Sequence, residues 1–399
     1  GKFPEAENIT LEWVGLFPGK RESRRFVGPY MLHQQDIVEQ HTHFDGITYG
    51  GWSIDLHPSD GVFSEKNACN QWHSKGVYQI PYRCYITKDI DNIFIAGRLI
   101  SASHIAFGSS RVMATSAVGG EVVGTAAALC LKNHWLPADL ADKDKIIFLQ
   151  SALIEAGNYI PQLNFLSNNN LLGHAIINTS SELQLNEIPF QDGFWKKLSL
   201  SSAQMLPVEK GKFPRLSVKI KADKETELKL ELRISSKNFN HTPDIVLASK
   251  NYAVHQGEQM IEIDFEAEIP ITCYAFVCFM KNENLELMFS PYRITGILSV
   301  FSKVVPAVSN GGKQIVTEDI GIEEFEFWCP ERRPDGHNIA MKISPAISAF
   351  GKENLLNSIY RPVEKPNAFV AGLYDQKVNI TAKWPTPIAI HQITIFADT

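Results

Sequence analysis

The sequence predicts an α/β part followed by one or two antiparallel β-sandwich domains, and three observations support this. A long segment at residues 113–131 is apolar and rich in small residues. After Asn168-Asn169-Asn170 the spacing of the apolar residues changes from a period of 3.6 to a period of 2, which marks a change from helices to strands. A second β-rich stretch follows the linker Val304-Val305-Pro306. With 399 residues the chain is also too long for one ordinary core.

The α/β part is expected to contain a strand and a helix joined by a polar loop. Residues 92–97 read Asn-Ile-Phe-Ile-Ala-Gly, an apolar run that ends at a glycine, and predict a buried strand. Residues 113–131 predict the helix. Because glycine is a poor helix former, we expect Gly120 and Gly124 to let this helix press closely against a sheet.

Three strands of the β-rich part are visible in the alternation of apolar and polar residues. They cover residues 216–220, 228–234 and 261–265. Such alternation is typical of antiparallel strands with one buried face and one solvated face. The side chains expected to point inward include Leu216, Val218, Ile220, Leu228, Leu230 and Leu232.

These patterns divide the chain into four parts. Between the α/β part and the first sandwich, apolar residues at helical spacing over 145–156 predict a helix that Gly157 ends. The predicted parts are the α/β domain at 1–131, a helical connector at 132–166, a β-sandwich at 167–305 and a second, truncated β-rich domain at 306–399.

Composition and charge argue against several classes of protein. The net charge of −6 lacks the positive excess that a general nucleic-acid binder carries. No run of 18 apolar residues is present, so we expect no membrane span. The six cysteines form no C-x-x-C pair, and no Cys/His cluster has zinc-finger spacing. We therefore expect free, mostly buried thiols and no metal site.

The strongest functional signal lies in residues 92–131. A strand that ends at Gly97 would let a ligand touch the backbone, because no side chain is in the way. The helix that follows begins with free amide groups, which can face an anionic or electron-rich group. The pattern by itself leaves an ordinary strand–helix unit without a ligand as the alternative.

Over its full length this segment resembles the C-terminal flavin motif of the FAD-dependent oxidoreductase family. The resemblance implies the C-terminal part of a two-dinucleotide-type FAD-binding fold, so that residues 1–131 are a partial FAD-binding and substrate domain. The strand end is then expected near the ribityl and pyrophosphate groups of FAD, and the helix start at the pyrimidine edge of the flavin. The residues assigned to FAD on this basis are Gly97, Arg98, Ser101, Arg111, Met113, Ala114 and Thr115.

A second matching segment carries a cluster of positive charge. Residues 18–25 read Pro-Gly-Lys-Arg-Glu-Ser-Arg-Arg, which is similar to a P-G-x-R-E-S-R-R block of the family. By this resemblance Arg21 and Arg24 are assigned to a cationic wall beside the flavin, where positive charge would stabilise the reduced flavin anion. A solvated surface cluster is the alternative.

Two histidines and three neighbouring residues complete the predicted site. His57 follows Asp55 in a G-G-x-x-x-D-x-H block similar to the family's, and His104 lies in the loop after the flavin strand. Both are candidates for proton transfer. Tyr82 and Arg83, in a Y-x-I-P-Y-R-C element, are assigned with Asp55 to the substrate, and simple packing is the alternative for Tyr82 and Arg83.

The resemblance extends into the β-rich part, but the sequence contains no glycine-rich phosphate-binding turn. Residues 149–161 match a further family segment, and the strand expected at 390–396 belongs to a region similar to galactose-binding, discoidin-like sandwiches. No G-x-G-x-x-G phosphate-binding turn is present. We therefore expect the sequence to be part of a longer protein and not to hold FAD by itself.

The predicted function is hydride transfer between a small organic substrate, with carbohydrate-related compounds as one class, and FAD. The alternative is a non-catalytic protein whose β domains bind carbohydrate or a partner and whose flavin motif is vestigial. The sequence leaves the substrate, the electron acceptor, the compartment and the oligomeric state open.

Overall fold

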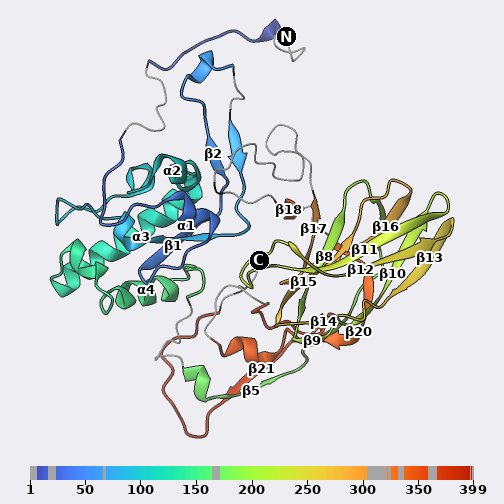
Figure 1. Cartoon of the computed structure of the whole chain (residues 1–399). Coiled ribbons are helices and arrows are strands. Elements are labelled where there is room, and N and C mark those ends of the chain that lie inside the picture. The colour runs from blue at the N-terminus through green and yellow to red at the C-terminus, as the bar shows by residue number, and fades with distance from the viewer. Residues whose placement is uncertain are drawn as a thin grey trace.

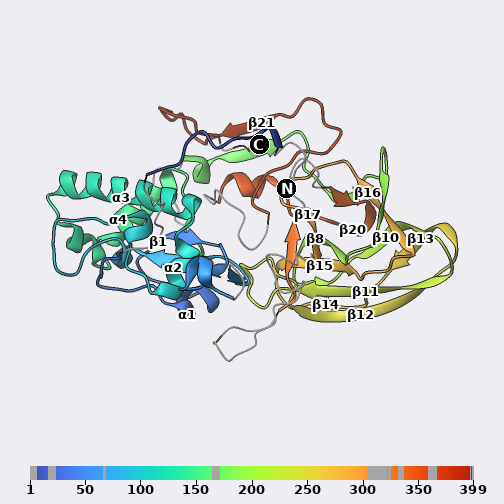
Figure 2. The same cartoon turned by 90° about the horizontal axis from the view of Figure 1, so that it is seen from above.

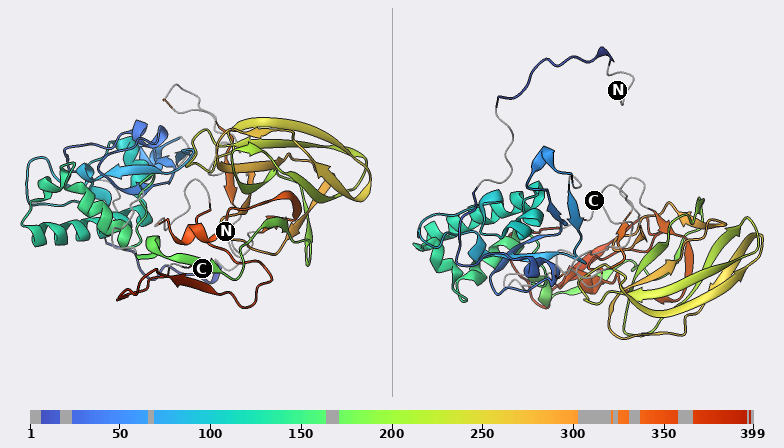
Figure 3. Two further views of the ribbon diagram at one scale, coloured as in Figure 1. Left: turned by 90° about the horizontal axis from the view of Figure 1, so that it is seen from below. Right: turned by 45° about the horizontal axis from the view of Figure 1, so that its top comes forward.

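The computed structural model separates the chain into a helix-containing N-terminal unit (residues 24–163) and a strand-rich β unit (residues 176–347), drawn at the left and right of Figure 1. Residues 7–16 precede the N-terminal unit and extend away from it (Figure 3). The structure describes residues 7–16, 24–65, 69–163, 171–302, 321, 325–330, 337–357, 366–395 and 397.

The N-terminal unit consists of short two-stranded antiparallel sheets covered by helices. The pair β1–β4 lies at its centre, and β2 pairs with β3 beside it. Its elements are α1 (Gln34–Val38), β1 (Gly46–Gly50), β2 (Ile54–Leu56), β3 (Asn70–Trp72), β4 (Tyr78–Pro81), α2 (His104–Ser110), α3 (Met113–Asn133) and α4 (Ile146–Glu155), with 3-10 turns at Gly61–Phe63, Tyr82–Cys84, Gly97–Leu99 and Pro137–Ala141.

The predicted strand at 92–97 is wrong. Within this segment the strand-like pairing is one isolated bridge between Phe94 and Ile86, in which Ile95 N donates to Tyr85 O. A strand needs a neighbouring strand over its length, and no described residues pair with the rest of the segment. Gly97 instead opens a 3-10 turn with φ of +62°, a conformation that favours glycine.

The long helix is confirmed as α3, but its predicted packing residues are wrong. Gly120 and Gly124 are exposed, and a Cβ at either position would meet no atom within 4 Å. The buried face runs through Thr115, Gly119, Val122, Ala126 and Cys130 instead. At Gly119 an added Cβ would lie 2.8 Å from the Tyr85 ring, so close packing does depend on a glycine, one position earlier than predicted.

The predicted connector is part of the N-terminal unit. Its helix is confirmed as α4, and Gly157 follows that helix with φ of +90°. Leu149 and Leu153 of α4 share one buried core with Ile47 of β1 and Val122 of α3. Residues 132–163 therefore complete this core rather than linking two separate ones.

By length and composition alone, α3 could cross a membrane, with 21 residues and a mean hydropathy of 1.4 in its most apolar window, of which 28% is buried. A core helix of a soluble protein can meet the same criteria, so this is weak evidence.

The β unit contains two antiparallel sheets whose inner side chains meet in one core. The seven-stranded sheet has the order β19-β16-β10-β20-β6 with β13 and β7 beside it, and the six-stranded sheet has the order β12-β11-β15-β8-β17-β18. The first sheet consists of β6 (Leu185–Ile188), β7 (Phe194–Lys197), β10 (Arg215–Ala222), β13 (Gly257–Ile263), β16 (Leu285–Ser290), β19 (Asn338–Ile339) and β20 (Met341–Ile347). The second consists of β8 (Ser202–Val208), β11 (Thr226–Ile234), β12 (Ile245–Val254), β15 (Cys273–Phe279), β17 (Leu298–Ser302) and β18 (Trp328–Pro330).

The period-2 prediction is confirmed for the two long strands β10 and β11. The six predicted inward side chains are at most 1% exposed, and all lie in the shared core: Leu216, Val218, Ile220, Leu228, Leu230 and Leu232. The alternation of apolar and polar residues predicts which side chains point inward, because each strand has one face toward the opposite sheet.

The boundary predicted at residue 305 does not separate two domains in the structure. β18, β19 and β20 lie beyond it in the sequence, yet they pair with β17, β16 and β10 of the same two sheets. Small pairs lie outside these sheets: β5 (Ile176–Thr179) with β21 (Ile380–Lys383), and β9 (Gly211–Lys212) with β14 (Glu268–Ile269). All four strands are labelled in Figure 1, and β21 and β14 are seen again from above in Figure 2. Short 3-10 turns occur at Leu171–His174 and Lys352–Leu355.

Two smaller predictions concern the C-terminal strand and the cysteines. The strand expected at 390–396 is not formed over 390–395, and Phe396 lies outside the described residues. As predicted, the six cysteines form no disulfide bonds, and four of them are buried: Cys84, Cys130, Cys273 and Cys278.

Candidate functional site

A hollow of about 280 Å³ lies between β2 and α2. Four of the residues assigned from the sequence line it together, namely Asp55, His57, His104 and Arg111. The other lining residues are Leu56, Phe107 and Gly108.

Local structure explains why these side chains meet. β2 carries Asp55 and is followed at once by His57, while α2 begins at His104 and is capped at its end by Arg111. A Cβ at Gly108 would lie 2.9 Å from the Asp55 carbonyl oxygen and 3.1 Å from a methyl group of Leu56. The missing side chain therefore allows α2 to approach β2 closely enough to form the hollow.

Asp55 joins the polar groups of the hollow. Arg111 Nη2 donates to the Asp55 carbonyl oxygen at 3.0 Å and to its carboxylate Oδ2 at 3.2 Å. The same Oδ2 lies 3.5 Å from His57 Nε2. The other carboxylate oxygen, Oδ1, is buried and has no hydrogen-bond partner among the described residues. Asp55 thus orients both a guanidinium and an imidazole at one side of the hollow.

Arg111 was predicted with the cofactor residues, and the structure groups it with the residues predicted for proton transfer and substrate. Its guanidinium carbon also lies 5.7 Å from the centre of the Phe107 ring, and Arg25 lies 5.5 Å from the same ring. Of the predicted cationic wall, Arg24 is exposed and does not line the hollow, and Arg21 lies outside the described residues.

The remaining residues assigned to FAD surround the start of α3. Gly97, at the turn before it, has its nearest potential Cβ contact at Ser116, 3.9 Å away, in the first turn of the helix. The N-cap residue Val112 offers no side-chain hydrogen bond. Met113 and Ala114 are exposed, Thr115 is buried, and Arg98 is exposed on the Gly97–Leu99 turn.

The amide groups at this helix start are the donors that fit a bound anionic or electron-rich group. Val112 gives α3 no side-chain cap, so the first amides of the helix are left as donors. These donors suit the phosphate or ring-carbonyl groups of a cofactor. The Oγ atoms of Ser101, Ser110 and Ser116 also have no hydrogen-bond partner among the described residues, but they are closed off from solvent. No group of three or more His, Cys, Asp or Glu side chains in the described part of the chain is arranged to hold a metal ion.

Tyr82 and Arg83 do not line the hollow. Tyr82 is fully buried in the core, donates to the Pro137 carbonyl oxygen at 2.6 Å, and has its pKa raised by burial. Arg83 forms a two-point ion pair with the buried Asp45, with Nε and Nη2 at 2.9 and 3.0 Å from its two carboxylate oxygens. Both placements agree with the packing alternative.

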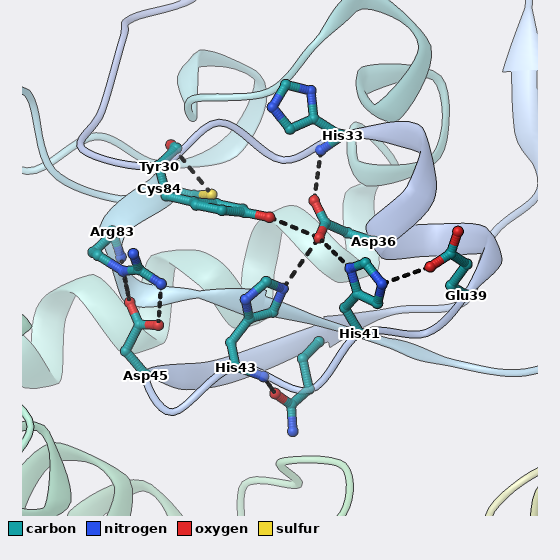
Figure 4. A network of polar contacts seen from close by, with 10 residues as sticks. Tyr30, His33, Asp36, Glu39, His41, His43, Asp45, Arg83 and Cys84 are labelled. Carbon is teal, nitrogen blue, oxygen red and sulfur yellow. Dashed lines mark hydrogen bonds and ion pairs between the residues drawn. The ribbon is translucent and has the colours of Figure 1, made fainter.

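The structure also contains a polar network that the sequence did not reveal, centred on Asp36 of α1 (Figure 4). Its carboxylate accepts from Tyr30 OH and the His33 backbone N–H, both at 2.7 Å, and lies 3.2 Å from His41 Nδ1 and 3.5 Å from His43 Nε2. Burial opposes ionisation, but the interactions of the carboxylate with these groups outweigh it and lower the pKa of Asp36. The spacing of Asp36, His41 and His43 was the available signal, and it matches no common motif.

Comparison with known proteins gives one match. Residues 2–153 match the model of the family described as FAD dependent oxidoreductase. Searches of curated proteins and of solved structures found no match. The matched segment contains the whole hollow and the start of α3, and the family implies FAD as the cofactor. Residues 2–153 of this chain are therefore similar to the FAD dependent oxidoreductase family, as the sequence motifs predicted.

Proposed function

We propose that this protein is an enzyme that transfers a hydride between a small organic substrate and FAD, and that the reaction takes place at the hollow between β2 and α2. The observation that carries the proposal is that Asp55, His57, His104 and Arg111 line one hollow inside the segment that matches the flavoenzyme family. A guanidinium and two imidazoles around a small cavity can bind and orient a polar substrate and move its protons.

The residues proposed to hold FAD are those around the start of α3. Gly97 would let the cofactor approach the backbone, and the amides of Met113, Ala114 and Thr115 would face its ring carbonyls. Arg98 and Ser101 complete this proposed set. FAD, when bound, supplies the hydride acceptor or donor. Arg21 and Arg24 keep their proposed role as nearby positive charge.

Within the hollow, His57 is the better-supported proton-transfer residue. Its Nε2 lies 3.5 Å from Asp55 Oδ2, so the carboxylate can orient the imidazole and stabilise it when protonated. His104 stands at the first position of α2 on the same hollow and is proposed as a second proton-transfer group. Phe107 provides an apolar surface between them.

The two packed sheets of the β unit are proposed to be an antiparallel β-sandwich of the type that extends some members of the family. Resemblance to galactose-binding domains remains a prediction for the residues that follow it.

The test uses the complete natural protein loaded with FAD. Quenching of flavin fluorescence should report stoichiometric binding, and anaerobic mixing with a panel of small alcohols, amines and sugar acids should bleach the flavin absorbance for at least one compound. His57→Gln and His104→Gln should slow this bleaching by about 10²–10⁴-fold, the usual contribution of general acid–base catalysis. His255→Gln is the matched control, because that side chain is 80% exposed on the β unit. Failure of the complete protein to bind FAD would refute the proposal.

A further inference from the structure

The guanidinium of Arg111 is fixed in the hollow while part of its bonding capacity is unused. Both of its hydrogen bonds, to the Asp55 carbonyl oxygen and to Oδ2, come from Nη2. Among the described residues Nη1 and Nε have no hydrogen-bond or ion-pair partner. The side chain is 12% exposed, so its ordering is already complete before a ligand arrives. A fixed guanidinium with free N–H groups is suited to an anion, to which Nη1 or Nε can donate a hydrogen bond.

The other charges of the hollow limit which anion fits. Asp55 is the one carboxylate among the residues that line it, and its Oδ2 is engaged by Arg111 and lies 3.5 Å from His57. Its Oδ1 is buried in the same wall. This negative charge would repel a phosphate dianion more strongly than a carboxylate, which brings a single charge. His57 and His104 also line the hollow, where an imidazole N–H is a donor suited to an anionic ligand.

The volume of the hollow also favours a small organic anion. A volume of about 280 Å³ is at the lower end of small-molecule sites. It suits a short organic acid or a single sugar ring rather than an oligosaccharide.

We propose that this hollow binds a substrate through a carboxylate group, and that Arg111 is the residue that recognises the carboxylate. The inference rests on the proposed function for the identity of the hollow as the reaction site, and it adds the chemical class of the substrate. It assigns Arg111 to the substrate rather than to FAD.

Calorimetric titration of the complete natural protein with matched pairs of compounds tests this. D-Galacturonate is compared with D-galactose, and succinate with succinamide, so that each pair differs in carboxylate charge. At least one acid should bind at least ten times more tightly than its neutral counterpart. Arg111→Gln should remove this preference, and Arg111→Lys, which keeps the charge without the fork, should retain part of it. Arg215→Gln should leave it unchanged, because Arg215 is 67% exposed and pairs with Asp264 on the β unit.

The inference is overturned if acids and their neutral counterparts bind equally, or if neither acid binds. It is also overturned if inorganic phosphate binds more tightly than any acid, or if Arg111→Gln binds the acids as tightly as the wild type does. Thermal melts of the variants show whether each is folded. If Arg111→Gln does not fold, the acid preference of Arg111→Lys is compared with that of the wild type instead. FAD binding is followed separately by flavin fluorescence. A protein that binds FAD without preferring acids contradicts this inference alone, whereas a protein that binds no FAD contradicts the proposed function.

Discussion

The side-chain amides of Gln40 and Asn240 form two hydrogen bonds with each other across the boundary between the N-terminal unit and the β unit. Gln40 Nε2 donates to Asn240 Oδ1 at 2.6 Å, and Asn240 Nδ2 donates to Gln40 Oε1 at 2.8 Å. Both residues are buried, at 4% and 2% exposure. Asn240 belongs to the connection between β11 and β12, which also contacts the N-terminal unit through the ion pair of Asp244 with Lys75 at 3.0 Å. The two units are thus held together by a specific polar contact.

We expect Asn240→Ala to destabilise this contact. The change would leave the Gln40 amide buried and partly unsatisfied, which costs about 1–3 kcal/mol. Urea unfolding of the complete protein should show the loss, and limited proteolysis should become faster near the boundary. Asn251→Ala is the control, since Asn251 hydrogen-bonds to Glu227 at an exposed position of β12 and should change stability by less than about 0.5 kcal/mol. Equal effects of the two substitutions would contradict the role of Asn240.

The packing of α3 predicts opposite effects for two of its glycines. Gly119→Ala would place a Cβ 2.8 Å from the buried Tyr85 ring and should destabilise the protein by about 1–3 kcal/mol. Gly124→Ala meets no atom within 4 Å and should stabilise it by about 0.5–1 kcal/mol, because alanine favours the helix. Thermal unfolding of both variants checks the sign of each effect. A stabilising Gly119→Ala would show that the helix does not rest on Tyr85.

The Asp36 network predicts a dependence of stability on acid. The nearby His43 imidazole and hydrogen bonds from the His33 N–H, Tyr30 and His41 lower the pKa of Asp36 in the folded protein despite its burial. A carboxyl whose pKa is lower in the folded than in the unfolded state adds stability above its ordinary pKa, and this stability is lost as the pH falls. Urea unfolding of the wild type should therefore weaken from about pH 5 downward. In Asp36→Asn the same fall should be smaller, and an identical pH profile would contradict the assignment.

Features that depend on neighbouring residues could be predicted from the sequence, whereas features that depend on distant residues could not. The directions of Leu216 to Leu232 were predictable because alternation along one strand determines which side chains face the opposite sheet. Helix α3 was predictable from composition, but its buried face was not, because Tyr85, which selects Gly119, lies far away in the sequence. The strand at 92–97 failed for a related reason, since an apolar run needs pairing partners that the sequence pattern cannot supply.

In the candidate site, too, the residue types could be predicted from the sequence, whereas their arrangement could not. Asp55, His57, His104 and Arg111 were named from the resemblance of separate segments, and the structure adds that they share one hollow. Their relation depends on Gly108, which received no role in the sequence because its importance lies in the backbone of β2 beside it. The contacts of Asp36 with His41 and His43 were missed because these types and spacings carry no established meaning.

The hollow itself depends on Gly108, and a single methyl group there should disrupt it. In Gly108→Ala the new Cβ would lie 2.9 and 3.2 Å from the backbone oxygen and nitrogen of Asp55, atoms that cannot turn away as a side chain could. Helix α2 must therefore move off β2, and Arg111 must move away from Asp55. We expect a loss of about 1–3 kcal/mol in stability from the overpacking and, at temperatures where the variant stays folded, weaker binding of carboxylates. Gly120→Ala, on the exposed face of α3, is the matched control and should change neither property adversely. Carboxylate binding in a folded Gly108→Ala variant that equals the wild type would show that the spacing between α2 and β2 does not set the geometry of the hollow.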